Sequence, residues 1–141
     1  MSSVLGAFRG NVRDELSFMN VGARPDPTQT FYRANLPRLP LDSRSDVLTT
    51  QVMTSVPIYL YEGDLVTNLT FVSGVTAANT PTKYWFALYS NAGVPALLAQ
   101  TADQTTTAWA ADTAKTLPLA APVRITKSGI YWAAIMVKAT G

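Results

Sequence analysis

The chain has 141 residues, of which 11 are Lys or Arg and 9 are Asp or Glu, so its formal net charge is +2. It contains no Cys and no His, which excludes disulfides, thiolate nucleophiles, zinc sites of the usual His/Cys kind and Ser-His or Cys-His dyads. The near-balanced charge produces no strong field toward nucleic acid or membranes. Composition therefore favours a structural or binding protein without a cofactor over an enzyme.

The distribution of charge divides the chain into two parts. Residues 1–50 carry 11 of the 20 charged side chains, including six of the seven Arg, but no Lys. The remaining 91 residues carry nine charges, including all four Lys. Because density and type change together, we predict an extended N-terminal arm over residues 1–48 and a folded domain over 49–141.

Within the arm, five apolar residues recur three or four positions apart, which is the spacing of one helical face. Asn11 is a suitable N-cap and Gly22 a suitable stop, so the pattern predicts a short helix near 11–20. The residues from Arg24 to Pro27 cannot continue it, because two prolines interrupt the backbone. The five apolar residues are Leu5, Phe8, Val12, Leu16 and Met19.

The rest of the arm has no sustained period and predicts an extended strap. Aromatic and Leu side chains are costly to leave in water, so we expect the strap to bind a partner. Five acidic residues accompany the arginines and no three basic residues cluster, which favours a protein partner over nucleic acid. The residues predicted to contact that partner are Phe31, Tyr32, Arg33, Leu36, Arg38, Leu39 and Leu41.

From about residue 48 the sequence alternates with period two, as short strands do. Turn residues separate the strands, with Glu62–Asp64 and Asn91–Gly93 as two examples. Seven or so strands follow at short intervals with no long helix between them, which predicts an all-β fold, an antiparallel, jelly-roll-like β-sandwich. The expected strands span residues 47–61, 65–74, 82–90, 95–102, 114–119, 122–126 and 128–139, with a short helix or loop about Trp109 before the fifth.

Alternation also predicts which side chains form the core. The strand 82–90 places Tyr84, Phe86 and Leu88 opposite Trp85, Ala87 and Tyr89, and the last strand is apolar on both faces, as a central strand would be. Val52, Val56, Ile58 and Leu60 share one face of the first strand, and Leu65, Leu69 and Phe71 share one face of the second.

Aromatic residues are the main candidates for binding. In neighbouring pairs such as Trp85/Phe86 and Tyr131/Trp132, one ring must lie outside the core. Subunit interfaces are enriched in such rings, so we predict that Trp85, Tyr89 and Tyr131 point outward and mediate self-association. A platform for stacking sugars is the alternative interpretation of the same rings.

The carboxylates give a weaker signal. Glu62 and Asp64 sit at a predicted turn, where acidic residues form local hydrogen bonds. Asp103 and Asp112 would have to lie about 5–10 Å apart to hydrolyse glycosides. A calcium site built from Asp64, Asp103 or Asp112 remains an alternative, because hard cations require only oxygen ligands. We predict no catalytic residue and no metal ligand.

The segment from about 65 to 139 carries a run of features: FVSGVTAANTPT, then YWFALY, then LLAQTADQTTTAWAADT, and finally SGIYWAAIMV. In this combination it resembles a β-sandwich module of phages that infect actinobacteria, which recurs in minor tail proteins and capsid decoration proteins. The resemblance implies a structural role in the virion and brings no catalytic residue. The arm has no obvious counterpart.

The expectation is therefore a capsid decoration (cement) protein on the outer surface of the capsid. It would be a homotrimer whose arm binds the major capsid protein. The start of the chain lacks a basic, apolar leader and no stretch is long enough to span a bilayer, so we expect synthesis in the host cytoplasm and no membrane partner. The alternative is a tail or head-fibre module that binds glycans of the host surface, and a glycan depolymerase is a more distant one.

Overall fold

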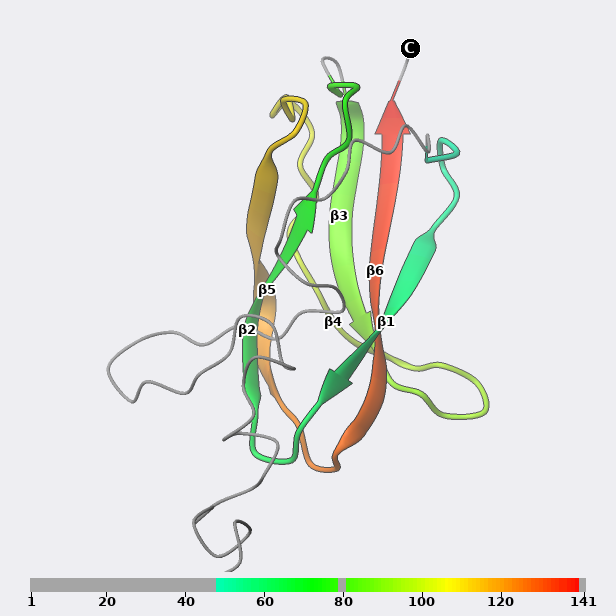
Figure 1. The fold of residues 1–141 in the computed structure, drawn as a ribbon, viewed down its shortest axis with the longest axis vertical. Coiled ribbons are helices and arrows are strands. Elements are labelled where there is room, and N and C mark those ends of the chain that lie inside the picture. The colour runs from blue at the N-terminus through cyan, green and yellow to red at the C-terminus, as the bar shows by residue number, and fades with distance from the viewer. Residues whose placement is uncertain (1–47, 79–80, 140–141) are drawn as a thin grey trace, which may run out of the picture. The chain divides into compact units, whose positions relative to one another are not determined.

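A computed structural model describes residues 48–78 and 81–139, which are all-β with two antiparallel sheets and no helix (Figure 1). It follows that no helix in this part is long and apolar enough to cross a membrane. The strands are β1 (Thr54–Leu60), β2 (Leu65–Val72), β3 (Pro81–Tyr89), β4 (Leu97–Gln100), β5 (Ala114–Arg124) and β6 (Gly129–Ala139).

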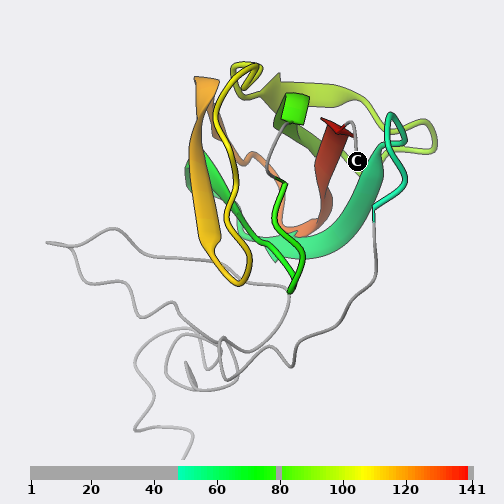
Figure 2. The same cartoon turned by 90° about the horizontal axis from the view of Figure 1, so that it is seen from above.

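The first sheet has four strands in the order β1-β6-β3-β4, and the second pairs β2 with β5. The predicted central position of the last strand is confirmed, because β6 lies between β1 and β3. An isolated bridge between Thr101 and Leu119 joins the chain after β4 to β5. Viewed from above, the strands of both sheets surround a common interior (Figure 2).

The core fills this interior with residues from both sheets. Tyr84, Phe86 and Leu88 of β3 are completely buried, which confirms the predicted inner face of that strand. The rings of Tyr84 and Phe86 each lie 5.7 Å from the ring of Trp109, which belongs to the loop before β5. Packed aromatic rings at this separation stabilise a core beyond their buried area. The segment about Trp109 is thus a loop that supplies a core side chain.

Two predicted strands, 114–119 and 122–126, form a single strand, β5. Pro122 suggested a break, because proline has no N–H for a sheet ladder. Val66 of β2 pairs with Val123, whereas Asn68 pairs with Pro118, so the ladder is irregular opposite Thr67. Pro122 lies within this irregularity, where ladder hydrogen bonds are interrupted, and the strand continues past it.

The same irregularity changes which residues of β2 face the core. Leu69 and Phe71 face it as predicted, but Leu65 is 45% exposed. Val66 packs against the core cluster in its place. A shift of one residue in a strand moves a side chain to the opposite face, so the prediction for Leu65 was wrong.

The predicted turn at Glu62–Asp64 is present. Gly63 has a φ of 90°, and the backbone N–H of Tyr61 donates to Oδ2 of Asp64 at 2.9 Å. The turn is tied to the second sheet, because the N–H of Gly63 donates to the carbonyl of Ile125 and the N–H of Ile125 to the carbonyl of Asp64, both at 2.8 Å. The acidic residue serves local hydrogen bonding here, as its position in a turn suggested.

The predictions for the arm fall outside this part of the chain. The helix near 11–20 and the seven strap residues, from Phe31 to Leu41, precede the first described residue.

Candidate functional site: an aromatic groove on the outer face

The outer face of the four-stranded sheet is formed by the side chains that alternate with the core residues. On β6, Ile135 belongs to the core cluster and Tyr131 and Val137 pack against it, so the residues that alternate with these three point away from the core. The same alternation assigns three residues of β1 and four of β3 to this face. Its residues are Ser55, Pro57 and Tyr59 of β1, Ile130, Trp132, Ala134, Met136 and Lys138 of β6, and Lys83, Trp85, Ala87 and Tyr89 of β3.

The register of the strands arranges this face in rows of large and small side chains. Trp132 lies beside Pro57 on one strand and Tyr89 on the other, and Met136 lies beside Trp85. Between these rows, Ala134 pairs with Ser55 and with Ala87.

The row of small side chains lies between the two rows of larger ones. Ala87 and Ala134 are each only 1% exposed although they are on the outer face. Flanking side chains of greater height account for this burial, because successive residues on one face of a strand are close neighbours.

A groove of about 570 Å³ lies at the end of this face nearest the β3–β4 loop. Its wall combines the outer face with that loop, and none of the described side chains that line it is charged. The groove is lined by Met53, which precedes β1, by Ser55, Tyr89 and Trp132 of the four-stranded sheet, and by Asn91, Ala92, Gly93 and Pro95 of the loop.

A hydrogen bond between distant parts of the chain holds the aromatic wall of the groove. The indole Nε1 of Trp132 donates to Oδ1 of Asn91 at 2.9 Å. Within the loop, the N–H of Ser90 donates to the carbonyl of Ala96 at 2.9 Å, and the N–H of Ala96 donates to the hydroxyl of Ser90. The loop is therefore closed at its base and attached to β6 at Asn91.

The outward aromatic residues were only partly predicted. Trp85 and Tyr89 lie on the outer face and are half-buried. The prediction for Tyr131 was wrong, because its ring packs against the core and its hydroxyl donates to the carbonyl of Lys127 at 2.9 Å. Trp132 is the outward ring of this pair. Alternation places residues 131 and 135 on one face, but both faces of β6 are apolar, so the pattern alone did not indicate which face lies in the core.

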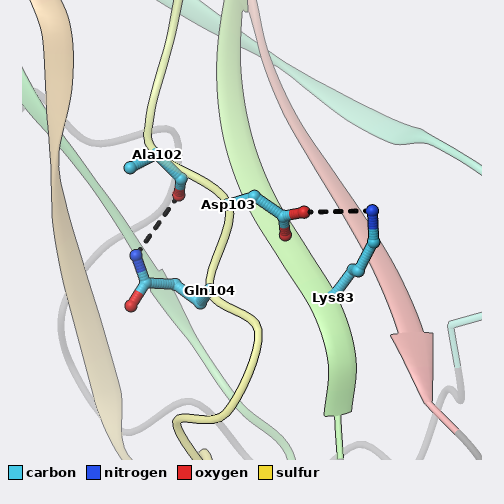
Figure 3. Close-up of polar contacts among 4 residues, drawn as sticks. All are labelled: Lys83, Ala102, Asp103 and Gln104. Carbon is cyan, nitrogen blue, oxygen red and sulfur yellow. Dashed lines mark hydrogen bonds and ion pairs between the residues drawn. The ribbon is translucent and has the colours of Figure 1, made fainter.

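The candidate carboxylates make separate contacts in the structure. Asp103 lies 3.7 Å from the ammonium group of Lys83, in a solvent-exposed ion pair, and Gln104 donates to the carbonyl of Ala102 at 3.2 Å (Figure 3). Asp64 belongs to the turn after β1, and the N–H of Asp112 donates to the carbonyl of Gly74. Among residues 48–78 and 81–139, no three metal-ligating side chains gather at one point.

Tyr84 is a titratable group that no expected site uses. Its side chain is completely buried, and its hydroxyl has no hydrogen-bond partner among the described residues. Burial raises the pKa of this phenol, because the charged form is poorly solvated. Rings of Trp109 and Phe86 surround it, so it belongs to the core and not to the groove.

No known protein family, curated protein or solved structure matches the chain. The chemistry of the outer face and the resemblance of residues 65–139 are therefore the grounds for a functional proposal. The face offers aromatic surface, neutral polar groups and a groove, all of which serve binding.

Proposed function

We propose that this chain is a structural protein of a phage virion, a capsid decoration protein that binds the assembled major-capsid lattice through residues 1–48. Its folded domain would be a jelly-roll-like β-sandwich of the kind that residues 65–139 resemble. The observation that supports this best is the outer face of the four-stranded sheet, on which two rows of large side chains flank a row of small ones and the charged residues are Lys83 and Lys138 at one end.

The residues of the outer face suit contact with other protein. Tyr59 and Ile130 are paired across β1 and β6 and both are exposed, and Met53 and Leu97 are exposed farther along the two outer strands. Interfaces are enriched in aromatic residues and Met, and their centres are depleted of charge. Lys83 and Lys138 are paired at one end of the face, where a polar rim would lie.

In this proposal the two parts of the protein have different tasks. The outer face, through Trp85 and other side chains outside the groove, packs against further copies to form a homotrimer. Each arm then contacts capsid subunits through the strap residues from Phe31 to Leu41. The three arms of one trimer bind the same shell together, so contacts that are weak singly give strong attachment. An arm that binds assembled shells but not free subunits stabilises the shell by mass action.

The test removes the arm. Full-length protein and a chain lacking residues 1–46 are mixed with phage shells that lack the protein, and binding is measured by co-sedimentation. We expect the shortened chain to keep its β-sheet circular dichroism and to lose binding. Equal binding by both chains would refute the role of the arm. A matched control chain carries Phe31→Leu and Tyr32→Phe, which keep apolar contact and should retain most of the binding.

A further inference from the structure

We propose that the groove beside the β3–β4 loop is a binding site for a neutral saccharide, independent of the attachment to capsids. Its aromatic wall is Trp132 with Tyr89 next to it in the register. The axial C–H groups of a pyranose ring form an apolar face, which packs against an indole in the way that other apolar groups do. The groove thus offers the ring surface on which sugars are bound.

The hydrogen bond from Trp132 determines how Asn91 meets a ligand. Because the indole N–H can only donate, it faces the carbonyl oxygen of the Asn91 amide at 2.9 Å. The amide nitrogen of Asn91 is consequently turned to donate its hydrogens elsewhere. One interaction therefore fixes the orientation of the indole and presents a donor beside it.

Further polar groups line the same groove. Ser55 and Tyr89 each bring a hydroxyl, which both donates and accepts hydrogen bonds. A sugar hydroxyl also has both capacities, so it matches such partners. Sites for small ligands typically have a small number of polar groups set among apolar side chains.

Charge and size narrow the class of ligand. None of the eight described residues that line the groove is charged, so these residues supply no counter-ion for phosphate, sulfate or a carboxylate. A volume of about 570 Å³ lies within the usual range for small-molecule sites. A neutral mono- or disaccharide unit, free or at the end of a surface glycan, meets both conditions.

Protein contact is the other interpretation of aromatic rows, since cross-strand aromatic pairs also stabilise sheets. It does not account for the pairing of Trp132 with Asn91, which lies in the loop and not on a neighbouring strand. It also does not account for the hollow between Trp132 and the loop. We therefore assign this end of the outer face to a saccharide and make protein contact an outcome of the test.

The test uses the full-length protein and a panel of neutral oligosaccharides: cellobiose, lactose, mannobiose, N,N′-diacetylchitobiose and their longer oligomers. Binding is measured by calorimetry and by the change in tryptophan fluorescence. We expect at least one series to bind with a Kd below about 10 mM. If no oligosaccharide of the panel produces heat or a change in fluorescence at a ligand concentration of about 10 mM, the proposal is overturned.

Variants locate the site. Trp132→Ala should weaken binding at least about tenfold, and Asn91→Ala about fivefold. Asn68→Ala is the matched control for Asn91→Ala, since Asn68 is exposed on β2 of the other sheet, and it should change Kd less than about twofold. If Trp132→Ala fails to fold, the Kd values of Trp132→Phe and Asn91→Ala are used to locate the site. A larger loss from Trp85→Ala than from these variants, together with dissociation of the oligomer, would show a protein interface and overturn the assignment.

Discussion

The indole Nε1 of Trp132 donates a hydrogen bond to Oδ1 of Asn91 at 2.9 Å, across 41 positions of sequence. Trp132 is in β6, the central strand of the four-stranded sheet, and Asn91 is in the loop between β3 and β4. The bond attaches an otherwise exposed loop to the sheet and shapes one wall of the groove. It is also the first interaction that mutagenesis should examine.

A double-mutant cycle measures this bond. Trp132→Phe and Asn91→Ala each remove one partner, and the coupling energy between them should be about 0.5–1 kcal/mol, because the bond is solvent-exposed. The free energies of unfolding of the wild type, the two single variants and the double variant come from urea titrations. Strict additivity of the two single losses would show that the bond does not stabilise the loop.

Two leucines of β2 test the irregularity between Val66 and Asn68. Leu69 is 7% exposed and belongs to the core, so Leu69→Ala should lower the free energy of unfolding by about 2–4 kcal/mol. Leu65 is exposed, so Leu65→Ala should cost less than about 1 kcal/mol. Chemical denaturation of both variants makes the comparison. Similar losses would mean that β2 keeps a regular alternation with Leu65 in the core.

Alanine substitutions at two glycines distinguish the effect of backbone strain on stability from that of steric crowding. A Cβ at Gly63 or at Gly129 would meet nothing within 4 Å, but only Gly63 has a positive φ, at 90°. Gly63→Ala should therefore destabilise the fold by about 1 kcal/mol or more, whereas Gly129→Ala should be neutral or slightly stabilising. Thermal unfolding of the two variants, followed by circular dichroism, checks the difference. Equal melting temperatures would contradict a strained turn at Gly63.

The unpartnered hydroxyl of Tyr84 gives a prediction about pH. Tyr84→Phe removes a buried group without a partner in the described residues, so it should raise the free energy of unfolding by about 1 kcal/mol at neutral pH. Burial raises the pKa of Tyr84 above its ordinary value of 10.0. The folded state therefore holds this proton more tightly than the unfolded state.

The sign of the pH effect follows from that difference in proton affinity. The contribution of the raised pKa is fully present below pH 10.0, the ordinary value, and is lost as the pH rises from there through the folded-state pKa. Wild type should lose stability more steeply than Tyr84→Phe as the pH rises above 10.0, as measured by urea titration at each pH. Parallel pH profiles would indicate that the hydroxyl reaches solvent or a partner.

Much of the fold could be predicted from alternation alone. Tyr84, Phe86 and Leu88 are buried together as their spacing predicts, and the two apolar faces of β6 correctly indicate a central strand. Period two is a local property of the strand, because successive side chains leave the backbone on opposite sides. The turn at Gly63 is equally local, since a glycine between two acidic residues carries the information within three positions.

The groove, in contrast, could not be predicted from the sequence. Tyr131 and Trp132 are both aromatic neighbours on an apolar strand, and which ring points outward depends on the sheet that packs against β6. Leu65 and Val66 exchange faces because of an irregularity in the pairing with β5. The meeting of Asn91 with Trp132 depends on the course of a loop after its strands have paired. Composition and alternation determined the all-β fold of the described residues, with aromatic residues on both sides of a sheet. Pairing register and loop closure, which join distant residues, decided where those aromatic residues line a groove.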